Sequence, residues 1–382
     1  MSWGGIVRGW CLVSAIALWP SIARAYPQWQ LSTGMSRCDQ CHVSPSGGGL
    51  LSEYGRRIDG DRLSTFAGDG AFLHGAAKLP AWLALGADGS GGLVSQAVEN
   101  ASPSAPAYPI AGQAQAAVAL GPVSIYGTIG ARTQIRTDSG DVPVQNIQPL
   151  TDPWLVSSEH WVMWRPESGH SYLRAGRYFA PFGLRLALDS AFVRRELGFG
   201  LLQESYNLSG GYVTDRWELH VTAFAPDFVQ HLGDTESGGA VYFERRIGTR
   251  GAVALQAKYA TSAGKQRTIG GAIGKVYFST IRTLVFAEAD ALMLSVYGLA
   301  GRGQSVGAVG VAVLPARGLT VTALGEYFQE DVEVRAAARG ATSLVIGWLP
   351  YAHVEAQAVA RVELPAGGAT TTAFLTQLRY WL

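Results

Sequence analysis

Residues 353–364 read HVEAQAVARVEL, and their polarity alternates from one residue to the next. The apolar set consists of Val354, Ala356, Ala358, Ala360, Val362 and Leu364. The polar set between them consists of His353, Glu355, Gln357, Arg361 and Glu363. Because successive side chains of a β-strand point to opposite faces, this period of two predicts a strand with one apolar and one polar face.

The same alternation runs through most of the chain from about Pro80 to Leu382. In residues 216–225, for example, Leu219, Val221 and Ala223 alternate with Glu218, His220 and Thr222. We count roughly 16 such segments (14–16) of about ten residues, the length of a tilted strand that crosses a bilayer. The pattern predicts an all-β fold, an antiparallel outer-membrane β-barrel, with the lipid bilayer as its surroundings.

A soluble all-β protein is the alternative, because its strands also alternate. Long segments joined by short turns, such as residues 214–215 and 249–250, favour the membrane barrel. Aromatic residues also gather near segment ends, where membrane barrels carry interfacial girdles: Tyr172, Tyr178, Trp217, Tyr259, Tyr327, Trp348, Tyr351, Tyr380 and Trp381. The sequence finishes on an aromatic-rich segment, residues 374–382, of the kind that closes an outer-membrane barrel.

The composition agrees with such a barrel. The chain has 382 residues, of which 48 are glycine and only 15% are charged, and its net charge is +1. A balance so close to neutral gives no indication of a nucleic-acid partner. In the chain that follows the N-terminal stretch, no apolar run reaches the length of a membrane-spanning helix.

Residues 1–25 have the features of a secretory signal peptide. Arg8 precedes an apolar run over residues 10–19, which is too short to span a bilayer, and residues 23–25 form a small-x-small cleavage site. An uncleaved anchor is the alternative. Cleavage after Ala25 predicts export from a Gram-negative cytoplasm and removes Cys11, so that Cys38 and Cys41 remain.

Residues 38–42 read CDQCH, which is the C-x-x-C-H pattern of covalent haem attachment. Two thiols at this spacing reach the two vinyl groups of one haem c, and the histidine that follows is placed as an axial ligand. We therefore predict one haem c, bound covalently through Cys38 and Cys41, with His42 as the proximal ligand to the iron. A zinc site would need a second ligand pair, and a thioredoxin-type redox pair would need a βαβ pattern; the sequence shows neither.

The stretches around this motif, residues 33–38, 42–45, 47–51 and 54–57, resemble the head of the fused monohaem cytochrome–porins of the bacterial outer membrane. The resemblance covers roughly residues 26–57. It implies a small N-terminal cytochrome segment followed by a β-barrel, and electron exchange with a periplasmic cytochrome or other electron carrier. Some members of this group oxidise ferrous iron at the cell surface, so the resemblance also implies extracellular Fe(II) as a substrate and a possible iron(II) oxidase activity.

The second axial ligand is left open by the sequence. His74 follows the haem segment closely and can fold back, although a solvated loop histidine is an equally good interpretation. Met35 is the alternative, but its tether of three residues to Cys38 makes the opposite haem face hard to reach. A methionine ligand raises the reduction potential relative to a second histidine.

These observations divide the chain into a signal peptide (residues 1–25), a short helical or irregular monohaem cytochrome c segment (26–74) and a transmembrane barrel (75–382). The cytochrome segment is too small for much of a core, so we expect it to plug the lumen. Residues 96–111 and 136–153 are expected to be loops. Residues 179–204 interleave arginines with aromatics; they are either a surface loop or a lumen constriction that cradles the haem propionates.

Two functions follow from this organisation. The first is electron transfer across the outer membrane through a haem held in the barrel. The alternative is a passive porin whose haem segment is a tethered periplasmic module or sensor. An iron(II) oxidase would favour clustered carboxylates near the haem, for which Asp39, Glu53, Asp59 and Asp61 are the candidates.

Overall fold

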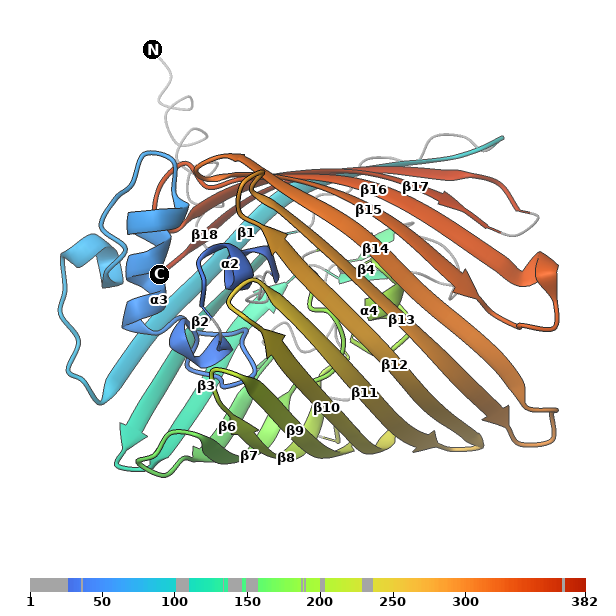
Figure 1. Cartoon of the computed structure of the whole chain (residues 1–382), viewed down its shortest axis with the longest axis horizontal. Helices are drawn as coiled ribbons and strands as arrows, with labels where there is room; N and C mark the ends of the chain where they lie inside the picture. The colour runs from blue at the N-terminus through green and yellow to red at the C-terminus, as the bar shows by residue number, and fades with distance from the viewer. Residues whose placement is uncertain are drawn as a thin grey trace, which may run out of the picture.

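The computed structural model describes residues 27–382, apart from Ser36, 101–109, Thr133, 137–145, 149–156, Ala187, Asp189, 200–202, 229–235 and 366–367. The expected signal peptide and large parts of the two expected loops lie outside the described residues. Within the described residues, sixteen antiparallel strands form one closed barrel (Figure 1). This confirms the fold class and the strand number expected from the alternation.

The strands are joined in sequence order, and the last one closes on the first. They are β1 (Leu83–Val98), β2 (Ile110–Leu120), β3 (Val123–Arg132), β6 (His160–Trp164), β7 (Ser171–Tyr178), β8 (Ser205–Val213), β9 (Trp217–Ala225), β10 (Ser237–Ile247), β11 (Gly251–Ser262), β12 (Lys265–Phe278), β13 (Thr283–Val296), β14 (Arg302–Ala316), β15 (Leu319–Gln329), β16 (Ala338–Trp348), β17 (Val354–Leu364) and β18 (Thr371–Trp381). Between β3 and β6, the short strands β4 (Gln134–Arg136) and β5 (Asn146–Gln148) form a separate two-stranded sheet.

The apolar side chains of the strands lie on the outside of the barrel and the polar ones inside it, as the alternation predicts. On β9, Val221 is half exposed on the outer surface, whereas Glu218 and His220 are buried in the lumen. On β17, Gln357 and Arg361 point inward and are buried, and the alanines between them lie on the outside. The apolar outer surface therefore meets the lipid, and the polar side chains hydrogen-bond inside the barrel.

The aromatic residues divide between the two faces. Tyr259, Tyr327, Trp348, Tyr351 and Tyr380 are exposed on the outside, as expected for a girdle. Tyr172 and Tyr178 were expected there too, and this expectation is wrong, because both are buried in the lumen. Both belong to the alternate residues of β7 that point into the lumen, and Tyr178 Oη donates to Ser209 Oγ at 2.8 Å.

The two ends of the barrel differ. At one end the strands are joined by short turns such as residues 214–216, 248–250 and 317–318; at the other end the connections 99–109, 133–159 and 179–204 are long. Short turns are periplasmic and long loops extracellular in outer-membrane barrels. The turn end, which also holds the C-terminus, is therefore the periplasmic end.

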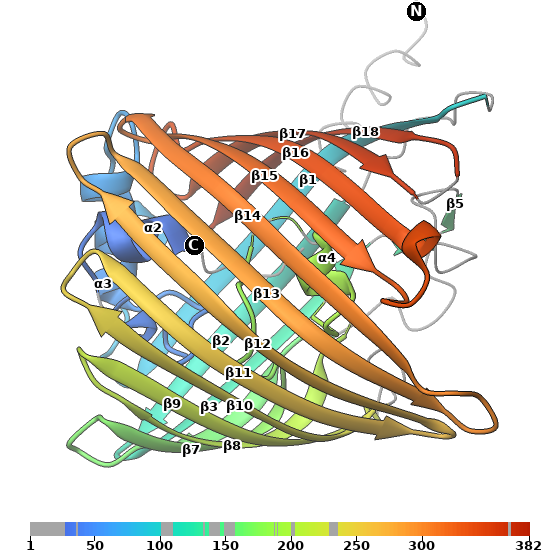
Figure 2. The same ribbon diagram turned by 45° about the vertical axis from the view of Figure 1, so that its right-hand side comes forward.

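Residues 27–82 lie at this periplasmic end (Figures 1 and 2). They contain α2 (Pro27–Ser32), α3 (Glu53–Ile58) and the short turns η1 (Cys38–Gln40), η2 (Asp59–Leu63) and η3 (Phe72–Gly75). We call residues 27–82 the N-terminal segment. None of the described helices is long and apolar enough to cross a membrane.

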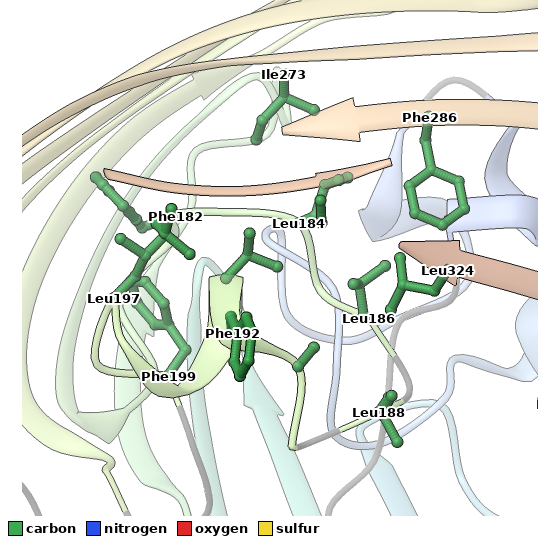
Figure 3. Packing of buried hydrophobic residues seen from close by; sticks show 14 of the residues in the cluster. Phe182, Leu184, Leu186, Leu188, Phe192, Leu197, Phe199, Ile273, Phe286 and Leu324 are labelled. Atoms are coloured by element: carbon green, nitrogen blue, oxygen red, sulfur yellow. The ribbon is translucent and has the colours of Figure 1, made fainter. Parts of the chain in front are cut away.

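We call residues 179–204 the inward loop, because its described residues fold into the lumen rather than over the surface. The loop leaves β7 and carries α4 (Phe192–Arg195). Its backbone reaches the far wall, where the Gly183 N–H donates to Gln256 Oε1 at 2.7 Å and the Leu184 N–H donates to Glu288 Oε2 at 3.0 Å. Strand side chains such as Ile273, Phe286 and Leu324 pack with its apolar residues into a buried core within the barrel (Figure 3). The lumen is thus narrowed by packed side chains.

Candidate functional site

The Cys38–His42 motif forms a tight turn that the following residues clamp. The N–H of His42 donates to the Cys38 carbonyl at 3.0 Å. The chain then reverses and returns antiparallel, so that the Val43 N–H donates to the Leu50 carbonyl at 3.0 Å. Gly47, Gly48 and Gly49 make this reversal with φ values of 77°, 77° and 63°, a left-handed region that favours glycine.

Helix α3 packs directly on the motif. A Cβ on Gly55 would lie 2.2 Å from the Cys41 carbonyl oxygen, so only glycine allows this approach. Ser52 caps the helix by accepting from the Gly55 N–H at 3.0 Å, and its hydroxyl donates to the Gln40 carbonyl at 2.9 Å. The backbone around both cysteines is therefore fixed by its own segment.

The motif is also tied to the periplasmic turns of the barrel. The side chain of Asp39 is 2% exposed; it pairs with Arg37 at 3.1 Å and with Arg165, in the turn between β6 and β7. Farther along, the Asp59 carboxylate accepts from the His353 N–H at 2.8 Å, and Arg317 donates to the Gly60 carbonyl at 3.0 Å. The N-terminal segment is thus docked in the barrel mouth.

Cys38, Cys41 and His42 line one cavity of about 210 Å³ in the lumen. Three parts of the chain enclose it. The N-terminal segment contributes apolar side chains such as Leu50 and Ile58, and the inward loop contributes Phe182, Leu184 and Arg185. The barrel wall contributes polar residues, among them Glu218, His220, Lys275 and Arg379.

The residues of this cavity fit a covalent haem. Both thiols and the imidazole face the same space. Burial, with the charge of Arg185, lowers the pKa of His42 to about 4, which keeps the imidazole in the neutral form that binds metals. The apolar side chains suit a porphyrin, and the Arg185 guanidinium, which donates to the Gly47 carbonyl at 3.1 Å, is a cation available for a propionate.

The two candidate distal ligands lie in different places. Met35 lines the cavity, and its sulfur lies 3.5 Å from the Tyr54 hydroxyl. His74 does not line it: its side chain is hydrogen-bonded to Tyr380 Oη at 3.0 Å and packs edge-on against His353, with ring centroids 4.8 Å apart. His220 of β9 also lines the cavity, from the barrel wall. The sequence did not indicate this histidine as a candidate ligand.

The four candidate carboxylates do not gather. Asp39 is bound to arginines, Glu53 pairs with Arg57 at 2.6 Å on the exposed face of α3, Asp59 is buried, and Asp61 is exposed. Among the described residues, no group of three or more His, Cys, Asp or Glu side chains is arranged to hold a metal ion. A dedicated iron(II) site beside the cavity therefore has no support from this part of the chain.

No protein-family model and no curated protein sequence matches this chain. Solved structures share its fold at low identity. OmpT of Vibrio cholerae is 11% identical over 80% of this chain and 99% of that one, with a TM-score of 0.55. OprB of Pseudomonas putida is 11% identical over 78% of this chain and 94% of its own, with a TM-score of 0.55. The outer membrane channel DcaP of Acinetobacter baumannii is 10% identical over 80% and 99%, with a TM-score of 0.53.

The fold and its lipid-facing surface define the class: the chain is an outer-membrane β-barrel with a porin-like fold. The bilayer of a Gram-negative outer membrane is its surroundings. The likeness concerns the fold and says nothing of the cysteine motif in the lumen.

Proposed function

We propose that this chain is a porin-type barrel that holds one covalent haem at the periplasmic end of its lumen and transfers electrons there. The observation that carries the proposal is the shared cavity of Cys38, Cys41 and His42. Bound there, a haem supplies one-electron redox chemistry.

The residues around the cavity have separate tasks in this proposal. The two cysteines and His42 hold the group, and Leu50, Ile58 and Phe182 exclude water from it. Arg185 offsets the negative charge of a propionate in the enclosed space. The barrel surrounds the site with hydrogen-bonded sheet, so lipid does not reach it.

The position of the cavity determines which partners can approach. It lies beside the periplasmic turns, so a periplasmic cytochrome or other carrier docking on these turns comes within a short distance of it. The hydrocarbon layer is about 30 Å thick, so an extracellular donor must enter the lumen past the inward loop. Ferrous iron is the donor that the sequence resemblance suggests.

Proteoliposomes test this proposal. A soluble cytochrome c is enclosed as the acceptor, and ferrous iron or a membrane-impermeant reductant is added outside. We expect reduction of the enclosed cytochrome with the wild-type protein and its loss in the double variant Cys38→Ala, Cys41→Ala. Equal reduction with both proteins would mean that the donor simply passes through the barrel.

A passive porin is the second candidate, and the comparisons favour it over the electron conduit. One of the structures of similar fold is described as an outer membrane channel, whereas none of the comparisons supports haem electron transfer. In this alternative the N-terminal segment and the inward loop narrow the route for small solutes. Single-channel conductance in a planar bilayer distinguishes the two, because a conduit filled by its haem segment is nearly closed to ions and a porin is open.

A further inference from the structure

His220 is a lumen histidine in which only one of the two ring nitrogens is hydrogen-bonded. Its side chain is 1% exposed. Nδ1 lies 2.7 Å from Tyr172 Oη, whereas Nε2 has no hydrogen-bond partner among the described residues. Glu218 Oε1 lies 3.6 Å from Nε2, which is too far for a hydrogen bond but close enough for an ion pair with a protonated ring, and Glu218 is itself bonded to Arg246.

The ring is held in place by three neighbouring strands. Tyr172 of β7 is opposite Gly211 of β8, and Gly211 is opposite His220 of β9. A Cβ on Gly211 would lie 2.4 Å from Tyr172 Cε1 and 2.9 Å from His220 Nδ1. The glycine therefore leaves the space in which tyrosine and histidine meet, and the tyrosine fixes the orientation of the imidazole.

A metal-binding histidine is usually oriented by a hydrogen bond at its other ring nitrogen, and Tyr172 Oη supplies such a bond to His220. In the tautomer in which Nδ1–H donates to Tyr172 Oη, the lone pair is left on Nε2, which can then bind a metal; in the other tautomer the tyrosine donates and Nε2 carries the proton. A buried polar nitrogen without a partner costs stability, so a structure that keeps one calls for an explanation.

His220 and the cysteine motif face the same cavity. Glu218, two residues before His220 on the same face of β9, lines this cavity together with Cys38. The barrel wall thus brings an imidazole to the haem segment from a strand remote in sequence.

We propose that Nε2 of His220 would bind the iron of a haem attached at Cys38 and Cys41, as a second ligand beside His42. This inference rests on the proposed function. The ligand would join the N-terminal segment to the barrel wall through the iron, in addition to the contacts with the turns.

Met35 and Lys275 also line the cavity and are the competitors. The Lys275 ammonium is occupied by Glu244 at 2.6 Å. Met35 comes from the same segment as Cys38 and shares its short tether. His74, outside the cavity and bonded to Tyr380, would have to leave both neighbours to reach the iron.

The test is the absorption and electron paramagnetic resonance spectrum of the purified holoprotein in detergent. We expect a low-spin, six-coordinate wild type and a high-spin His220→Ala variant, with low spin restored by added imidazole. Met35→Leu, His74→Ala and the outward-facing His160→Ala should remain low-spin. His220→Met keeps a ligand, so its reduction potential should rise. Tyr172→Phe should remain low-spin with a shifted potential, since only the support of Nδ1 changes.

A low-spin His220→Ala variant that still carries its haem would overturn the inference, and so would a high-spin wild type. Loss of low spin in Met35→Leu would assign the ligand to methionine instead. Heat-dependent gel mobility verifies that each barrel is folded. If His220→Ala does not fold, the reduction potential of His220→Met tests the inference in its place. Covalent haem staining distinguishes failure of the proposed function from failure of the ligand assignment. A wild type without haem refutes both. A protein that stains for haem but whose spectrum does not change in His220→Ala refutes only the assignment of His220.

Discussion

Nη1 of Arg174, on the lumen face of β7, lies 2.6 Å from Oγ of Ser44 in the N-terminal segment. A second donor of the same guanidinium, Nη2, reaches Ser46 Oγ at 3.0 Å, and the guanidinium stacks on the Tyr178 ring with its carbon 3.7 Å from the ring centroid. Arg174 is 1% exposed. One wall residue therefore holds the chain just beyond His42 by two charge-assisted hydrogen bonds.

Replacing Arg174 should loosen the N-terminal segment. Hydrogen bonds to a charged group contribute about 1.5–3 kcal/mol each, so Arg174→Ala should weaken docking by a few kcal/mol. We expect higher ion conductance in a planar bilayer. Arg216→Ala, in an exposed periplasmic turn, is the matched control and should conduct as the wild type does. Equal conductance of the two variants would show that the segment does not depend on this contact.

The assignment of the two barrel faces can be tested on β17. Ala358→Arg places a charge on the lipid face and should cost roughly 2–4 kcal/mol if it lies near the bilayer midplane. The neighbouring Gln357→Arg points into the lumen and should be tolerated. Urea titration of folding into lipid vesicles measures the difference. If both variants fold equally well, the outer and inner faces are misassigned.

Docking of the N-terminal segment should weaken as the pH rises. Burial, reinforced by the charge of Glu355, raises the pKa of Asp59 to about 7, above the ordinary value of 3.8. The docked segment therefore binds a proton that the released segment has lost, and stability is highest below about pH 4 and falls through pH 7. The full change corresponds to at most ~4 kcal/mol.

Conductance between pH 5 and pH 8 measures this effect. The wild type should open more often at the higher pH, and Asp59→Asn, which keeps the shape of the side chain without its charge, should show a smaller dependence. A pH dependence that is identical in Asp59→Asn would exclude Asp59 as its source.

Removing the proximal imidazole should separate attachment from ligation. His42→Ala leaves both thiols in place, so covalent haem staining should persist while the absorption spectrum changes, because the axial ligand sets the field at the iron. An unchanged spectrum in this variant would show that His42 is not a ligand.

Much of the barrel could be predicted from sequence because the pleat of a strand is a local property. The alternation in residues 216–225 and 353–364 gives both the strands and their faces. The inward course of residues 179–204 could not be predicted in this way. It depends on Phe182, Leu184 and Phe199 joining one core with side chains from strands far along the chain, and the same aromatic and basic pattern suits a surface loop.

The position of His220 in the candidate site also depends on long-range contacts that the local sequence does not predict. Met35 and His74 were chosen because they are close to Cys38 in sequence, whereas the register of β7, β8 and β9 decides which wall residue faces the cavity. The one available signal was a histidine at a lumen position of a clearly alternating strand. Only the closed barrel shows that this position and the motif share a space.

The mass of the intact mature protein shows whether a haem is attached at Cys38 and Cys41. The protein is purified from the outer membrane of a host that attaches c-type haem, denatured and measured beside the double variant Cys38→Ala, Cys41→Ala. We expect the wild type to be heavier than its polypeptide by the mass of one haem and the double variant to have the polypeptide mass alone. A wild type with the bare polypeptide mass, from cells that load their other c-type cytochromes, would contradict this expectation.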